Sequence, residues 1–113
     1  MKGRDLRAEA RIPVKEKGSL SAGSLGTEDA WFPCMVQEMS DNGLLILSGK
    51  DLSVGQVLDF KCELFPQKTL TCKVEIKHVS ATGAGAKIIE IDNRGAALCQ
   101  LYLQEQYSLK LHR

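Results

Sequence analysis

Two stretches decide the fold of this 113-residue chain: Leu58-Asp59-Phe60-Lys61-Cys62-Glu63-Leu64 and Leu70-Thr71-Cys72-Lys73-Val74-Glu75-Ile76-Lys77. Apolar and polar residues alternate strictly in both, so that successive side chains point to opposite faces. Such alternation predicts two half-buried antiparallel strands. Pro66-Gln67-Lys68 lies between them and predicts a hairpin loop. The centre of the chain is therefore expected to be a β-hairpin.

Other extended segments are predicted on both sides of this hairpin. The apolar run Leu44-Leu45-Ile46-Leu47 fits a strand buried on both faces. Ile12-Pro13-Val14 begins an extended stretch, because proline disfavours helix at the residue before it. The predicted extended segments outside the hairpin are a stretch that begins at residues 12–14, and residues 31–39, 44–47 and 84–91.

The C-terminal part changes to a helical pattern. Asp92 or Asn93 can cap a helix, and the apolar residues between Ala96 and Tyr102 have helical spacing. The helix is expected to run to about Tyr107, and residues 108–113 are expected either to fray or to extend it. Five or six short strands followed by one helix indicate a mainly all-β fold, either a small antiparallel barrel or a sandwich.

Charge and hydropathy exclude several classes of protein. The net charge of +1 argues against a general nucleic-acid binder, which needs a broad basic surface. Residues 1–17 nevertheless carry six Lys or Arg against three Asp or Glu, a basic arm that suggests a local anion site. No apolar run approaches the roughly 18 residues of a membrane span, so no membrane insertion is expected. The charged start lacks the apolar region of a signal peptide, and a cytoplasmic location is expected.

Neither metal chemistry nor catalysis is indicated by the residue pattern. The four cysteines form no CxxC pair, and the two histidines offer no ligand spacing, so neither a metal site nor a cofactor is expected. Reduced, buried thiols are the preferred interpretation. No paired carboxylates or nucleophile–base set is visible. We therefore expect a protein that is not an enzyme.

Two motifs occur in a set order ahead of the central hairpin. Arg7-Ala8-Glu9-Ala10-Arg11 is an RxxxR pattern that leads into the first extended stretch, and Glu38-Met39-Ser40-Asp41-Asn42-Gly43 precedes the apolar run. This order resembles the PilZ domain family, in which RxxxR is followed by [DN]xSxxG. Gly83-Ala84-Gly85-Ala86-Lys87-Ile88 resembles the glycine-containing strand of that family. The resemblance covers roughly residues 4–103.

The resemblance implies a single domain whose fold is a six-stranded antiparallel β-barrel with a C-terminal α-helix. Residues 1–11 would be a flexible basic arm, residues 12–107 the barrel and helix, and residues 108–113 a tail. It also implies a bacterial receptor for cyclic di-GMP, which changes conformation on binding and signals to a downstream protein partner.

The ligand-binding residues follow from the same resemblance. Arg7 and Arg11 would contact the nucleotide from the arm, since arginine offers a planar fork of donors for phosphate or guanine. Ser40 and Gly43 would contact it from the barrel, with a hydroxyl donor and a close backbone approach. The remaining candidates are Glu38 as an acceptor from guanine, Arg4 as a helper on the arm, and His78 as a stacking partner or a residue of the barrel rim.

One position departs from the family pattern. Glu38 stands where the family has Asp or Asn, so the carboxylate is kept but lies one methylene further out. The alternative hypothesis is therefore a degenerate PilZ module that binds no nucleotide and acts through protein–protein contacts.

Overall fold

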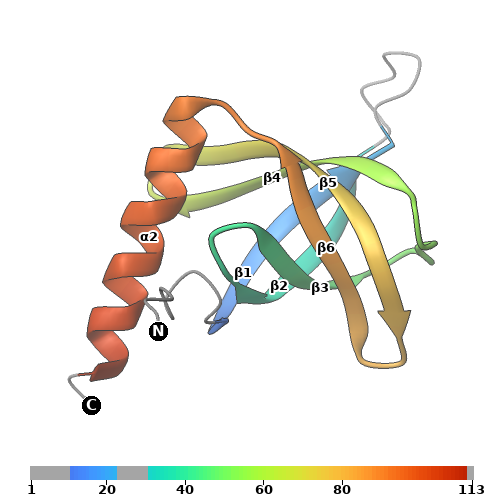
Figure 1. Ribbon diagram of the computed structural model, residues 1–113, viewed down its shortest axis with the longest axis horizontal. Coiled ribbons are helices and arrows are strands. Elements are labelled where there is room, and N and C mark those ends of the chain that lie inside the picture. Colours follow the sequence, from blue (N-terminus) through green and yellow to red (C-terminus); the bar gives the residue numbers. More distant parts are fainter. Residues whose placement is uncertain (1–10, 23–30, 112–113) are drawn as a thin grey trace, which may run out of the picture.

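Six strands and one helix form the part of the chain that this computed structural model describes, residues 11–22 and 31–111, with the backbone alone at residues 110 and 111. The elements are β1 (Ile12–Ser21), β2 (Phe32–Met39), β3 (Gly43–Ser48), β4 (Val57–Phe65), β5 (Lys68–Ser80), β6 (Gly83–Glu90) and α2 (Asn93–Leu111). The strands close into a barrel in the order β1-β2-β3-β6-β5-β4, and all neighbours are antiparallel. The predicted six-stranded barrel with a C-terminal helix is confirmed (Figure 1).

The central hairpin forms as its alternation predicts. Every second residue of β4 from Leu58 to Leu64, and of β5 from Leu70 to Ile76, is buried. The turn itself is only Pro66 and Gln67, because Phe65 pairs with Lys68. Gln67 has a φ of +64°, and proline followed by a positive φ is the pattern of a type II turn.

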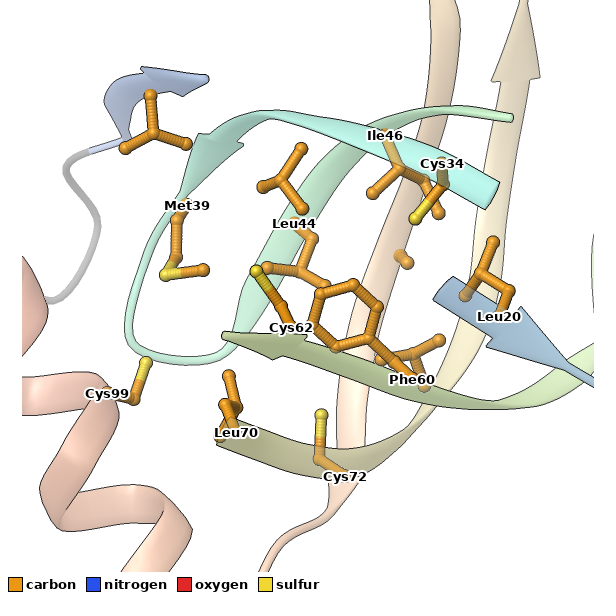
Figure 2. Close-up of a cluster of buried hydrophobic side chains, with 14 of the residues drawn as sticks. Leu20, Cys34, Met39, Leu44, Ile46, Phe60, Cys62, Leu70, Cys72 and Cys99 are labelled. Carbon is orange, nitrogen blue, oxygen red and sulfur yellow. The ribbon is translucent and has the colours of Figure 1, made fainter. Parts of the chain in front are cut away.

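The core fills the barrel interior with side chains from all six strands. Figure 2 shows Phe60 among them, with Leu20, Ile46 and Leu70 pointing into the same space. All four residues are at most 1% exposed. The four cysteines are free thiols and are also buried, which agrees with the interpretation made from the sequence.

The burial of strand β3 differs from the burial predicted from the sequence. Leu44 and Ile46 are buried, but Leu47 is 47% exposed on the outer surface. The expectation of burial on both faces was wrong because a barrel has one interior, and α2 packs mainly over β1, β4 and β5.

Helix α2 closes one end of the barrel. Asp92 caps it, since its Oδ1 accepts a hydrogen bond from the Gly95 N–H at 2.7 Å. Cys99, Tyr102 and Leu103 form the buried face, and the Tyr102 hydroxyl donates to the Glu16 carboxylate of β1 at 2.7 Å. The helix runs to Leu111, one turn past the predicted end at Tyr107, because no glycine or proline interrupts residues 108–111.

Candidate functional site

The turn between β2 and β3 holds the second motif. The Ser40 N–H donates to the Gly43 carbonyl at 2.9 Å, which closes the turn. The Ser40 hydroxyl lies 3.4 Å from Asn42 Oδ1 and 3.5 Å from the Gly43 carbonyl. Both distances are long for an O–H···O bond, whose usual range ends near 3.0 Å. The hydroxyl therefore keeps the capacity to bond a ligand.

Strand β6 approaches this turn closely. A Cβ added to Gly43 would lie 3.1 Å from the Ala86 carbonyl oxygen, so glycine is what allows the two backbones to come together. The Ile88 N–H donates to the Asn42 carbonyl at 2.8 Å. The motif turn and the middle of β6 thus form one rigid unit.

A bulge changes the direction of side chains near the end of β5. Ile76 pairs with Ala86 and His78 pairs with Gly85, so the register shifts between Ile76 and His78. Lys77 and His78 are both exposed, which breaks the alternation of the strand. Bulges commonly re-aim side chains in this way. The His78 ring covers Gly85, because a Cβ there would lie 2.6 Å from His78 Nε2.

These elements surround a cleft of about 340 Å³ on the outside of the barrel. Its lining residues in the described part of the chain are Arg11, Ser40, Asn42, Gly43, Leu44, Lys77, His78, Gly85, Ala86 and Lys87. Three of them are Lys or Arg, and none of those described is a carboxylate. The cleft is therefore suited to an anionic ligand with planar groups, which could stack on the imidazole.

Glu38 lies beside the cleft and is not among its described lining residues. A register shift between Val36 and Glu38 accompanies its outward position on β2. One Glu38 carboxylate oxygen is 4.0 Å from the Arg11 guanidinium, and the two side chains are 37% and 60% exposed. Such an exposed pair contributes little to stability. The two side chains therefore face each other beside the cleft without a tight ion pair.

The structure brings together four of the residues singled out from the sequence: Arg11, Ser40, Gly43 and His78. Arg4 and Arg7 lie outside the described residues. Lys77, Lys87 and Gly85 also line the cleft and were not predicted. For Gly85 and Lys87 the signal in the sequence was the Gly83-to-Ile88 strand, whereas Lys77 lies on the alternating strand β5 and looks there like a solvent-facing residue.

The thiols are not arranged for chemistry. Burial raises the pKa of Cys34 to about 11 and that of Cys62 to about 12, so both stay protonated and unreactive near neutral pH. Burial, followed by the charge of Asp41, raises the pKa of Cys99 to about 11. In the described part of the chain, no cluster of three or more His, Cys, Asp or Glu side chains could hold a metal ion.

No helix among the described residues is both long and apolar enough to cross a membrane.

Comparison with known proteins agrees with this architecture. The PilZ domain family matches residues 5–105, whereas no curated protein matches the chain. The fold is similar to that of the Bacillus subtilis inhibitor of motility MotI/DgrA, with a TM-score of 0.67 and 11% identity over 91% of this chain and 50% of that one. It is also similar to the PilZ domain of CeSA from a cellulose-synthesizing bacterium, with a TM-score of 0.62 and 13% identity over 89% of this chain and 98% of that one.

At these identities the two structures establish the fold alone. The chain spans half the length of MotI/DgrA and nearly the whole of the CeSA domain. The family match, in contrast, covers both sequence motifs and the entire barrel. The chain belongs to the PilZ domain family, whose members are generally cyclic di-GMP receptors or adaptors and not enzymes.

Proposed function

We propose that this protein is a receptor for cyclic di-GMP that binds the nucleotide in the cleft beside the β2–β3 turn. The observation that carries the proposal is the convergence of the two motifs. Arg11, the last residue of RxxxR, lines the same cleft as Ser40 and Gly43, which are 29 and 32 positions further along the chain.

The chemistry of the cleft suits this ligand. Cyclic di-GMP carries two phosphates and two guanines, so it needs cations, planar surfaces and donors or acceptors for the base edges. Arg11 is largely exposed and can exchange Glu38 for a phosphate or a guanine edge. The Ser40 hydroxyl supplies a donor, and the His78 ring supplies a flat surface over Gly85.

The signal would come from the arm that precedes β1. Arg7, and Arg4 as a helper, belong to this arm and would close over the nucleotide together with Arg11. Ordering of a segment on ligand binding is a common way to present a new surface to a protein partner. We propose that a partner reads the closed arm, as an adaptor function would require.

Calorimetric titration with cyclic di-GMP tests the proposal. We expect binding with a dissociation constant in the micromolar range or tighter. Arg11→Ala should weaken it by roughly tenfold or more, because a charged hydrogen bond is lost. Lys68→Ala is the matched control, since this exposed lysine is nine residues before Lys77 on β5, about 30 Å away along the strand. Loss of binding in both variants would contradict a local role for Arg11.

The alternative function, protein binding without nucleotide, rests on Glu38. Its carboxylate already faces Arg11 at 4.0 Å, and it replaces the shorter Asp or Asn of the family pattern. Absence of heat together with unchanged amide chemical shifts at high cyclic di-GMP concentration would favour this alternative and refute the receptor.

A further inference from the structure

Lys87 stands out among the residues that line the cleft. It is exposed on β6 next to buried Ala86, and its register partner on β3 is Gly43. Its side chain therefore lies on the outer face, beside the end of the Ser40–Gly43 turn. Neither sequence motif includes this position.

The backbone on both sides of Lys87 is tied to that turn. The Ala86 carbonyl lies 3.1 Å from where a Gly43 Cβ would be, and the Ile88 N–H donates to the Asn42 carbonyl at 2.8 Å. The backbone position of Lys87 is thus fixed relative to Ser40 and Gly43. Only its own torsions remain to be ordered when a ligand binds.

The charges around the cleft single out the same residue. Arg11 faces Glu38 at 4.0 Å, and Lys77 Nζ lies 3.3 Å from Glu75. Glu75 is also the cross-strand partner of Lys87, but within the described residues no ion pair within 4.0 Å involves Lys87. Among the described lining residues, its ammonium is the cation that an incoming anion meets without displacing a carboxylate.

We infer that Lys87 binds a phosphate of the nucleotide from the barrel side of the cleft, across from Arg11. This inference rests on the proposed function and deepens it. Strands β2 and β3 separate β1 from β6, so the two backbones lie about 14 Å apart when measured along the curved sheet. A ligand with two phosphates can offer one to Arg11 and the other to Lys87. Lysine acts there as a compact point charge, without the directional fork of arginine.

Calorimetric titration of five proteins with cyclic di-GMP tests this assignment. They are the wild type, the cleft variants Lys87→Ala, Lys87→Arg and Lys77→Ala, and the remote control Lys68→Ala. We expect Lys87→Ala to weaken binding by roughly tenfold. Lys87→Arg should stay within about threefold of wild type because the charge is kept. Lys77→Ala should cost less than Lys87→Ala, since Glu75 already neutralises that ammonium.

Repeating the titrations at about 50 mM and about 500 mM salt separates a charge contact from a packing effect. If Lys87 meets a phosphate, Lys87→Ala should weaken the salt dependence of the affinity as well as the affinity itself. Wild-type binding with unchanged affinity in Lys87→Ala, or a loss with unaltered salt dependence, would overturn the assignment and leave the receptor function standing. No binding by the wild type would remove both.

Discussion

The β4–β5 hairpin and the cleft face of β3, β6 and the end of β5 belong to the same barrel but differ in regularity. From Val57 to Glu63, β4 pairs with β5 in an unbroken ladder. Around the cleft, register shifts occur between Val36 and Glu38 and between Ile76 and His78. The hairpin buries every second side chain, whereas the shifted strands turn Glu38 and His78 outward.

This difference in regularity indicates that the two regions of the barrel have different roles. The regular ladder supplies apolar burial, which stabilises the fold roughly in proportion to the area removed from water. The bulged strands lose ladder regularity, and in return they gather polar side chains on one outer surface. Substitutions of exposed residues on the cleft face are therefore expected to affect stability less than substitutions in the core of the hairpin.

The largest expected effect on stability comes from a substitution in the core of the hairpin. Phe60→Ala should lower the free energy of unfolding by about 3–5 kcal/mol, because Phe60 is fully buried and its removal leaves a cavity. Urea denaturation followed by circular dichroism measures the change. The matched cleft variant, Lys77→Ala, should change stability by less than about 0.5 kcal/mol. Similar losses of stability in the two variants would contradict the proposed difference in role between the hairpin and the cleft face.

A pH experiment sharpens the same comparison through the buried thiols. Burial raises the pKa values of Cys34 and Cys99 to about 11, and those of Cys62 and Cys72 to about 12, from 9.0. Above pH 9 the unfolded chain loses these protons before the folded protein does. The contribution of the buried thiols to stability is therefore fully present below pH 9 and is lost as the pH rises toward their folded pKa values, by on the order of 1 kcal/mol per thiol at about pH 10.

Urea denaturation under reducing conditions at about pH 8 and about pH 10 measures this fall. Cys62→Ala destabilises the protein at every pH by removing buried atoms, so the informative quantity is the difference between the two pH values. In the variant, the stability difference between the two pH values should be smaller by the contribution of one thiol, which is on the order of 1 kcal/mol. A stability that does not change between the two pH values would contradict burial of the thiols.

The smallest expected effect concerns the cleft face. If Glu38 only orients Arg11, Glu38→Ala should change the affinity for cyclic di-GMP by less than about fivefold, because exposed ion pairs at this distance contribute at most about 1 kcal/mol. A loss of roughly tenfold or more would instead assign Glu38 the role of guanine acceptor expected from the sequence. Calorimetry with Glu38→Asp as the conservative partner decides between the two roles.

Sequence patterns predicted those parts of the molecule in which the environment of each residue follows from the residues next to it in the sequence. The alternation of β4 and β5 indicated which side chains are buried, and Asp92 was recognised as a possible helix cap. Burial on both faces of β3 was wrong, since an apolar run does not reveal whether anything covers the outer side. The helix extends to Leu111, beyond the expected end near Tyr107, because no residue in between carries a stop signal.

The candidate site divides in the same way. Arg11, Ser40, Gly43 and His78 could be named from motif order and strand position. Lys87 could not, because its proximity to Gly43 depends on the pairing of β3 with β6, two strands separated by β4 and β5 in the sequence. By itself the sequence determined the strands, the buried face of the hairpin and the two motifs, since these depend on local periodicity. Only the closed barrel decided which cations meet in one cleft, since long-range register sets the distances between them.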